Sequence, residues 1–445
     1  MDTIAELPFL KLNFDEKGAL EDPQQLSLLL NHLEHVRPRR LSVVSHGWRN
    51  DADYATSLYR ELFTNVSTRL KGRGVSGSGL PTVVGVYWPS LALPEEFGRP
   101  AAPQARGADG AAAATRGPSV DPDRIKDQLD ALIEGTFGGR EELEQAKNLL
   151  DDLEDRPGDQ IKFVELLRSV APPTSDASED NSERFLRGDP RLLFDRLARP
   201  IADMEQVGNG RAASFSSVLS RGAGAVLNTA QGALGSAFRL VNYLTFYLMK
   251  ERAEVIGGGL NRALAQVRTK NESLPIHLVG HSFGARVVTA AAARGARLDP
   301  CSLSLLQGAY SHNGLAAGSQ WEGGKDGYFR AILAEKRVNG PIIATHTVND
   351  QAVGVAYPIA SRLAGQNASA LGDANDPYGG VGRNGILHVL AGERGADERL
   401  LAADGDYEFA AGKTNNLLAD KYIMDHGDVR NPEVANAVAQ VILSL

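Results

Sequence analysis

The strongest constraint on the fold of this 445-residue chain lies in one segment, LPIHLVGHSFGARVVTAAAAR. Its apolar run Ile276–Val279 has the length and composition of a buried strand, and the small residues of Ala285–Arg294 suit a helix packed closely on a sheet. Between them lies Gly280–Gly284 (GHSFG), which matches the pattern G-x-S-x-G. In this setting the pattern predicts a sharp turn from strand to helix, with Ser282 exposed above the sheet and glycines where backbone segments come close.

Further apolar runs predict the rest of the sheet. They are short and continuous rather than alternating, which is typical of parallel strands covered on both faces. Because helical patterns such as Ala55–Leu70 alternate with these runs, we expect an α/β fold with a doubly wound, mostly parallel sheet. Asn431-Pro432 then caps and starts a terminal helix. The other expected strands are Leu41–Ser45, Thr82–Trp88, Ser302–Gln307, Ile342–Val348 and Ile386–Leu390.

The alternation of strands and helices stops between about residues 90 and 240. Arg99–Pro122 is a Pro/Gly/Ala/Arg segment without periodicity, typical of a flexible linker, whereas Ile125–Val170 is charged and has a helical pattern. We therefore expect residues 1–89 and 241–445 to form one α/β core. Residues 90–240 are expected to form a mainly helical cap or lid inserted into that core.

Composition and charge exclude several classes of function. The formal net charge of -8 argues against a nucleic-acid-binding protein, which would carry a basic excess or stripe. Cys301 is the single cysteine, so no disulfide forms within the chain, and burial as a small hydrophobe is its expected role. The N-terminus lacks the pattern of a secretory signal, and no window resembles a membrane span. We expect a cytoplasmic protein, and export by a route without a signal stays open.

The expected base is a late histidine. A serine hydroxyl becomes a good nucleophile only when an imidazole accepts its proton and an acid holds that imidazole in the right tautomer. After a G-x-S-x-G turn the expected order is serine, acid, histidine. His426 lies in a loop before the terminal helix, where the base should be. His346 and His388 fall within apolar runs and are expected to be structural, while His312 precedes any suitable acid.

The expected acid is Asp350, which follows the run IIATHTVN at the carboxyl end of a predicted strand. Functional side chains of open α/β sheets collect at that edge. Asp373 and Asp376 are rivals further along the chain.

Two backbone N–H groups are expected to form an oxyanion hole, one from Phe283 after the nucleophile and one from an earlier strand-to-helix loop. The motif SHGW supplies that loop, with Trp48 as the expected second donor and Gly47 allowing a close approach. Gly47, His281 and Trp88 are the residues expected to line the substrate site, and packing under the cap is the alternative for Trp88.

The chain offers no persuasive metal or cofactor site. Its nine histidines are dispersed, and it has neither HExxH nor a cysteine pair. The glycine-rich pieces Gly257–Gly259 and Gly379–Gly382 lack the lysine and the strand-to-helix setting of a phosphate loop, so both are expected to be turns. We expect no metal and no cofactor, and the oligomeric state stays undetermined.

With HGW after an early strand, GHSFG, an Asp after a later strand and a late His, the chain resembles the α/β-hydrolase superfamily of esterases and lipases. The likeness covers roughly residues 38–90 and 240–445, with the motifs in the order known for that fold. The chain also looks like poorly characterised microbial and fungal members with SHGW and GHSFGAR motifs, in which a segment like Tyr247–Gly257 precedes the nucleophile strand.

The resemblance implies acyl transfer: attack by Ser282, an acyl-enzyme, then hydrolysis by water that His426 activates. We expect a carboxylic-ester hydrolase that acts on small-molecule or lipid esters. The lipid expectation rests on apolar helices around Ala223–Leu248, which could form a lid that opens at an interface. The alternative for these helices is that they simply pack on the sheet as a cap. An amidase or peptidase with the same residues and a non-catalytic interaction protein are the alternatives. Two departures are the long insertion and the roughly thirty-odd residues between the last expected strand and His426.

Overall fold

Two compact units make up the chain in the computed structural model. Unit 1 comprises Met1–Ser90, Met249–Val353 and Gly380–Leu445, and unit 2 comprises Leu91–Leu248 and Gly354–Gly379. The structure describes residues 2–47, 52–90, 120–135, 138–171, 182–198, 232–321, 324–350 and 378–444.

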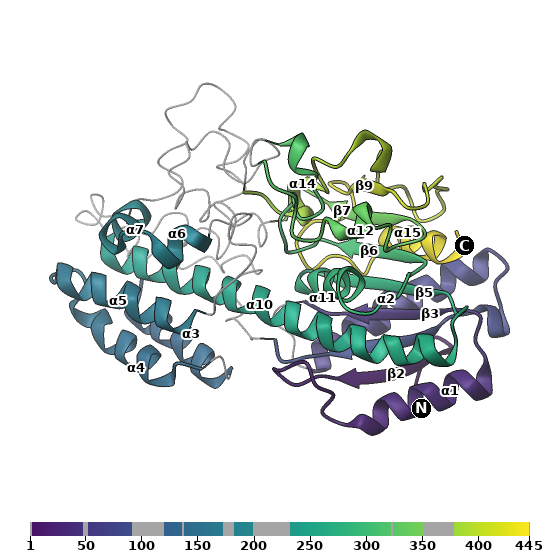
Figure 1. Ribbon diagram of the computed structural model, residues 1–445, viewed down its shortest axis with the longest axis horizontal. Coiled ribbons are helices and arrows are strands. Elements are labelled where there is room, and N and C mark those ends of the chain that lie inside the picture. Colours follow the sequence, from purple (N-terminus) through teal and green to yellow (C-terminus); the bar gives the residue numbers. More distant parts are fainter. Residues whose placement is uncertain are drawn as a thin grey trace, which may run out of the picture. The chain divides into compact units, whose positions relative to one another are not determined.

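Unit 1 is built on a nine-stranded sheet with the strand order β1-β2-β4-β3-β5-β6-β7-β9-β8 (Figure 1). Among the described strands, β1 and β2 pair antiparallel and every other neighbouring pair is parallel. The expected α/β class with a mostly parallel sheet is therefore confirmed. The strands are β1 (Asp2–Ile4), β2 (Leu7–Asn13), β3 (Leu41–Ser45), β4 (Thr82–Tyr87), β5 (Ile276–His281), β6 (Ser302–Leu306), β7 (Ile342–His346), β8 (Arg394–Arg399) and β9 (Thr414–Leu418).

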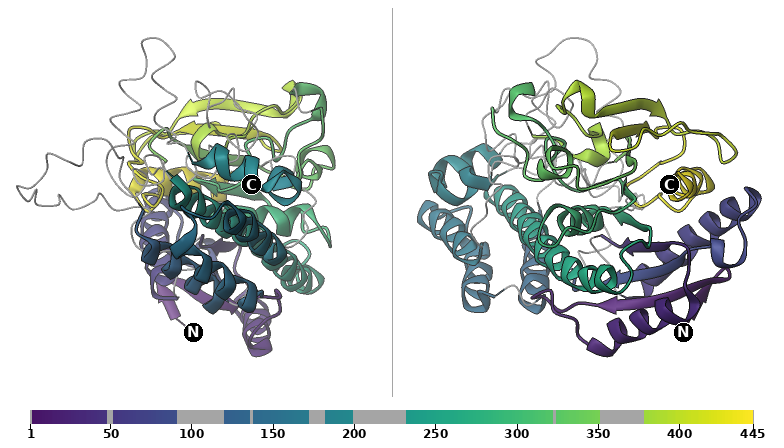
Figure 2. Two further views of the ribbon diagram at one scale, coloured as in Figure 1. Left: turned by 90° about the vertical axis from the view of Figure 1, so that its left-hand side faces the viewer. Right: turned by 45° about the vertical axis from the view of Figure 1, so that its right-hand side comes forward.

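Helices cover the sheet on both faces (Figure 2). The helices α2 (Ala52–Gly72) and α15 (Pro432–Leu443) share one buried apolar cluster with strand residues such as Val279. The helix α11 (Phe283–Ala293) lies against β3, β5 and β6, and Leu278, the neighbour of Val279, is also fully buried. Because successive side chains of a strand point to opposite faces, burial on both sides explains why these strands are continuous apolar runs.

The long helix α10 (Gly232–Lys270) packs its C-terminal part closely on α11. A Cβ added at Gly257 would lie 2.5 Å from the Cβ of Ala290. In addition, Arg286 Nε donates to the carbonyl of Lys250 at 3.1 Å. The expected turn at Gly257–Gly259 is thus wrong, because these glycines lie inside α10, where Gly257 lets α11 come close and Gly259 lets the backbone of Gly18 come close.

Unit 1 contains further helices and turns besides these. The glycines of Gly379–Gly382 lead into one of them, the single helical turn α14 (Val381–Asn384). The others are the helices α1 (Pro23–Val36) and α12 (Ala331–Ala334) and the 3-10 turns η1 (Gly77–Gly79), η5 (Gly318–Gln320) and η7 (Ala391–Glu393).

The described elements of unit 2 are helical. Pairs such as Gln128 and Asn242, whose side-chain amides exchange hydrogen bonds of 3.3–3.4 Å, link its helices internally. Within the described ranges, no helix is both long and apolar enough to cross a membrane. The helices are α3 (Pro122–Glu134), α4 (Arg140–Leu149), α5 (Pro157–Val170), α6 (Ser182–Arg187), α7 (Pro190–Leu197) and α10 up to Leu248, with the 3-10 turn η3 (Leu150–Asp152).

The expected strand at Ile386–Leu390 is wrong, and β8 and β9 take its place in the sheet. Residues 385–390 form no strand, and the backbone groups of Ile386 bond to the Asn416 side chain rather than to a neighbouring strand. Its amide accepts from the N–H of Ile386 at 2.9 Å and donates to the carbonyl of Ile386 at 3.0 Å. Since β9 ends at Leu418, the connection to His426 is short, and the long gap inferred from the sequence disappears.

We expect Asn416→Ala to destabilise unit 1 by about 2–6 kcal/mol, because two buried backbone groups of Ile386 would each lose a partner at about 1–3 kcal/mol. Urea and thermal unfolding of the variant measure this loss. The control is Asn31→Ala on the exposed surface of α1, which should shift stability by no more than about 0.5 kcal/mol. Equal stability of the two variants would contradict the strand-like role of the Asn416 amide.

Candidate active site

The turn that carries Ser282 has a strained backbone. Ser282 lies between the end of β5 and the start of α11, with φ 58° and ψ -125°. A non-glycine residue adopts such angles at a cost of about 1–3 kcal/mol, and such residues gather at functional sites. The neighbouring glycines are required sterically: a Cβ at Gly280 would lie 2.3 Å from the carbonyl oxygen of Gly284, and one at Gly284 would lie 2.2 Å from that of Ser45.

Ser282, His426 and Asp350 form one chain of hydrogen bonds. The Ser282 hydroxyl and His426 Nε2 are 2.8 Å apart, and His426 Nδ1 is 2.8 Å from Asp350 Oδ2. A carboxylate only accepts, so the Nδ1–H of His426 donates to Asp350 and Nε2 accepts from the serine. Ser282 and Asp350 are buried, while the His426 side chain is 20 % exposed. The three residues that the sequence indicated are therefore in direct contact.

The buried carboxylate of Asp350 has a second donor that sequence reasoning missed. Gln307, directly after β6 and itself fully buried, donates from Nε2 to Asp350 Oδ2 at 3.0 Å and to the carbonyl of Gly382 at 2.9 Å. A Cβ at Gly382 would lie 2.7 Å from Asp350 Oδ2, so glycine leaves room for the acid. Hydrogen bonds to the ionised form favour the charged state of a buried carboxyl group.

The loops that carry the acid and the base are tied to each other. Asn349, next to Asp350, donates from Nδ2 to the carbonyls of Asp420 and Ile423, at 3.1 and 2.9 Å. Asp420 Oδ1 in turn accepts from the Thr347 hydroxyl at 2.8 Å. The loops after β7 and β9, which carry Asp350 and His426, are thus bonded to each other in addition to their contacts around Ser282.

The loop after β3 approaches the serine closely. A Cβ at Gly47 would lie 2.3 Å from Ser282 Cβ and 2.8 Å from its Oγ, so only glycine fits at this place. Trp48, expected to supply an oxyanion donor, lies outside the described residues. Phe283, the other expected donor, is the first residue of α11, where backbone N–H groups and the helix dipole favour negative charge.

The buried side chain of His46 bonds to backbone groups around the loop after β3. Its Nδ1–H donates to the carbonyl of Gly47 at 2.9 Å, and its Nε2 accepts from the N–H of Trp88 at 3.4 Å. The ring stacks on that of Trp88 with centroids 5.4 Å apart. Burial lowers the pKa of His46 to about 4, so the ring is neutral and keeps this tautomer. Trp88, expected to line the substrate site, is buried against His46.

The rival residues have other bonding partners or fall outside the described residues. His312 bonds to Asn384 and His388 to Asn313, whereas the imidazole bonded to the Ser282 hydroxyl is that of His426. Burial lowers the pKa of both His346 and His388. Asp373 and Asp376 fall outside the described residues.

His281, expected at the substrate site, contacts the loop of the base. Its Nε2 is bonded to the backbone carbonyl of His426 at 2.8 Å.

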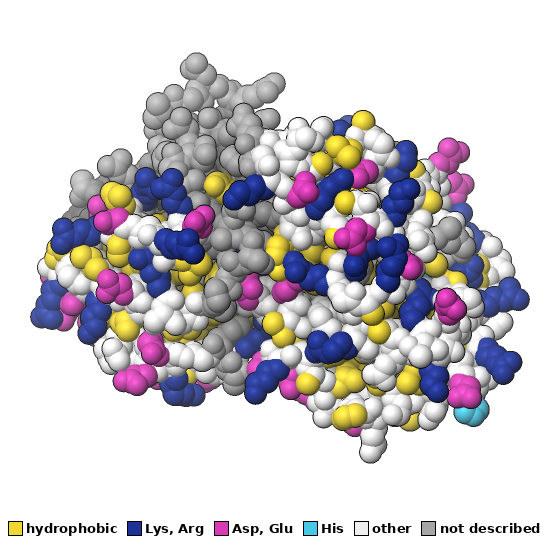
Figure 3. Space-filling view, in the orientation of Figure 1, with side chains coloured by type: hydrophobic (Ala, Val, Ile, Leu, Met, Phe, Trp, Pro, Cys, Tyr) yellow, Lys and Arg dark blue, Asp and Glu magenta, His cyan; other side chains and the backbone are white. Residues whose placement is uncertain are grey.

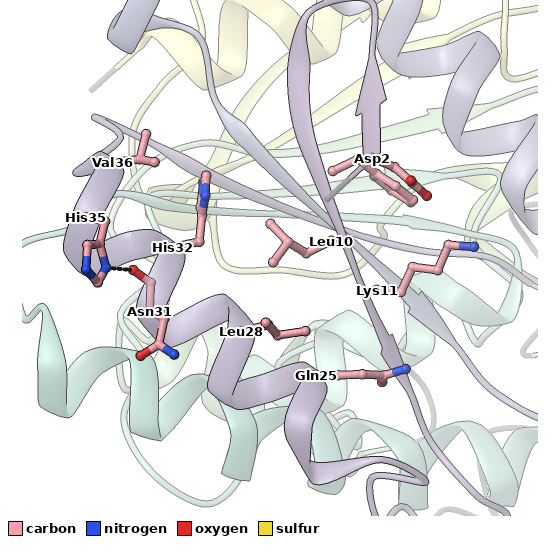
Figure 4. Close-up of a pocket in the computed structure, with 10 residues that line it drawn as sticks. Asp2, Leu10, Lys11, Gln25, Leu28, Asn31, His32, His35 and Val36 are labelled. Carbon is pink, nitrogen blue, oxygen red and sulfur yellow. Dashed lines mark hydrogen bonds between the residues drawn. The ribbon is translucent and has the colours of Figure 1, made fainter.

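Other surface features do not compete with this site. A cavity of about 500 Å³ lies between α1 and β2, with Leu10, Leu28 and His32 among its lining residues, but these residues include no nucleophile beside a base (Figure 4). On the face drawn in Figure 3, basic and acidic side chains mix, without a continuous basic stripe among the coloured residues. Among the described residues, no group of histidine, cysteine and acidic side chains is arranged to hold a metal ion.

Comparisons with family models, with curated proteins and with solved structures gave no match to the chain. The assignment of function therefore rests on the geometry of the site and on the sequence motifs that form it.

The strain at Ser282 predicts an unusual order of stabilities. Ser282→Gly and Ser282→Ala both lose the hydroxyl, but only glycine relieves the positive φ. We expect Ser282→Gly to be more stable than Ser282→Ala by about 1 kcal/mol. This difference is the relieved strain less the extra backbone entropy that glycine loses on folding. Glu61→Gly and Glu61→Ala in the exposed middle of α2 form the control, where glycine should be about 1 kcal/mol less stable. The same order at both sites, measured by urea unfolding, would contradict the strain.

Proposed function

We propose that this protein is a serine hydrolase that cleaves carboxylic esters through an acyl-enzyme on Ser282. The observation that carries the proposal is the hydrogen-bonded chain from the Ser282 hydroxyl through His426 to Asp350, with 2.8 Å at each step. A serine by itself is a weak nucleophile, and this is the arrangement that activates it.

The surrounding architecture supports an α/β-hydrolase type of fold. Ser282 follows β5 on a strained turn into a helix, and Asp350 and His426 follow β7 and β9 in the order serine, acid, histidine. The β3-to-α2 loop at Gly47 meets the serine on the side where this fold forms its oxyanion hole.

In the proposed acylation, Ser282 Oγ attacks the ester carbonyl carbon while its proton passes to His426 Nε2. The buried Asp350 carboxylate holds the imidazole in the required tautomer and stabilises the imidazolium that forms. The N–H of Phe283, with that of Trp48 as the expected second donor, stabilises the negative charge on the former carbonyl oxygen. As the intermediate collapses, His426 gives its proton to the departing alcohol.

Deacylation repeats these steps with water. His426 takes a proton from the water that attacks the acyl carbon, and then returns a proton to Ser282 Oγ as the acid product leaves. Each cycle consumes one ester and one water and restores the enzyme.

The apolar stretch of α10 is buried where the structure describes it. Every residue from Gly235 to Lys250 is buried, so this part of the helix presents no apolar side chain to solvent. The proposed substrate is therefore an ester in general, and interfacial contact with lipid stays an expectation from the sequence.

Labelling with a fluorophosphonate probe tests the proposal directly, because such probes react with an activated serine. We expect stoichiometric labelling of the wild-type protein at Ser282, and hydrolysis of a short-chain p-nitrophenyl ester. Ser282→Ala should not be labelled, and His426→Ala should lose at least about 10³-fold in kcat, since single members of such a triad are each worth a large factor.

Mass spectrometry of the labelled peptide identifies the modified position, so that reaction at any other serine would be recognised. Pure, folded wild-type protein that neither reacts with the probe nor hydrolyses any ester would contradict the proposal and favour an interaction protein.

Gln307 is expected to support the acid. Gln307→Met keeps the approximate side-chain volume but removes the donor to Asp350, so we expect kcat to fall about 10-fold or more with KM nearly unchanged, as hydrogen bonds to charged groups are worth about 1.5–3 kcal/mol. Gln320→Met, on the exposed turn η5, is the matched control and should behave like the wild type. An unaltered kcat in Gln307→Met would show that Asp350 needs no second donor.

A further inference from the structure

The imidazole of His281 lies buried between the nucleophile and the loop of the proposed base. His281 is the last residue of β5 and is 5 % exposed. Its Nε2 is 2.8 Å from the backbone carbonyl oxygen of His426, and the two rings have centroids 5.1 Å apart. The contact joins positions that are far apart in the sequence, next to the residue that carries the reacting hydroxyl.

The tautomer of His281 follows from this contact. A carbonyl oxygen only accepts, so Nε2 carries the proton and donates it. Burial, with a smaller effect of the neighbouring His426, lowers the pKa of His281 to about 3, so the ring stays neutral and carries one proton. Among the described residues, Nδ1 has no hydrogen-bond partner. The hydrogen bond that this buried ring makes is therefore the one to His426.

The bond from His281 to the backbone carbonyl of His426 restricts the direction of the His426 side chain. The peptide group is planar, so a fixed carbonyl fixes the rotation about the Cα–C bond of that residue. The flanks of the loop are held elsewhere: the carbonyl of Ile423 accepts from Asn349, and Gly427 N–H donates to Asp425 Oδ1 at 2.8 Å. The contact from His281 acts on the backbone of His426 itself.

We propose that His281 is a positioning residue that holds the backbone of His426 so that the imidazole stays at working distance from Ser282. This rests on the proposed function of Ser282 and His426. Because His281 and Ser282 are consecutive residues at the end of β5, one rigid strand sets the positions of both the hydroxyl and the ring that takes its proton. A displacement of about 1 Å in such an arrangement can cost about 10²-fold in rate.

Three variants separate the donor from the bulk of the ring. His281→Leu removes the donor, and we expect kcat to fall about 10- to 100-fold with KM changed less than about 2-fold. His281→Gln places an amide N–H near the position of Nε2, and we expect kcat within about 5-fold of the wild type. His277→Leu is the matched control and should keep the wild-type kcat: His277 lies on the same strand, is also buried, and bonds to Ser302 Oγ at 2.9 Å.

A second readout does not depend on turnover. In protein with ¹⁵N-labelled histidine, the Nδ1–H of His426 bonded to Asp350 should give a strongly downfield proton resonance, identified by its loss in His426→Ala. We expect this resonance in the wild type, in Ser282→Ala, in His281→Gln and in His277→Leu. In His281→Leu it should broaden or disappear, since the ring no longer holds one position.

The outcomes keep the two proposals apart. Wild-type kcat and resonance in His281→Leu would overturn the positioning role, and so would a loss that His281→Gln does not restore or that His277→Leu shares. If no ester is hydrolysed by the wild type but the resonance responds as described, the positioning role stands and the proposed hydrolysis fails.

Discussion

Crowding of the backbone around Ser282 is the constraint on which the rest of the site depends. The turn brings the carbonyls of β3, the start of α11 and the loop at Gly47 so close together that a Cβ at Gly47, Gly280 or Gly284 would meet atoms at 2.2–2.3 Å. This closeness leaves Ser282 with a positive φ, and the parallel sheet around β5 supplies the burial that outweighs the strain. The serine is thereby directed at the loops that follow β7 and β9.

Burial of the Asp350 carboxylate is the second demand, and it explains residues that have no chemistry of their own. A buried charge without partners is costly, so its surroundings must supply donors. His426 and Gln307 both donate to Asp350 Oδ2, and Gly382 leaves the space in which they meet. The hydrogen bond from His426 to Asp350 Oδ2 thus fixes the orientation of the imidazole on which the proposed proton transfer depends.

A structural feature could be predicted from the sequence where the residues that determine it are neighbours in the chain. The strand, turn and helix around Ser282 are readable because small and apolar residues stand at each required position, and the order of motifs indicated Asp350 and His426. In contrast, β9 (TNNLL) was missed because Asn415 and Asn416 look unsuited to a central strand. Their amides bond to backbone groups of Ile342 and Ile386, partners that only the folded chain brings near. The role of Gln307 was hidden for the same reason.

The site is assembled from loops, yet the nucleophile and the proposed positioning residue of the base lie side by side at one strand. His281 is the last residue of β5, which is paired on both sides by β3 and β6, and Ser282 follows it directly. A bond from the loop of His426 to a sheet residue costs little further freedom on the side of the sheet, because the sheet is already ordered. In the proposed mechanism β5 therefore contributes to setting the distance for proton transfer, together with the bond between Asn349 and Ile423.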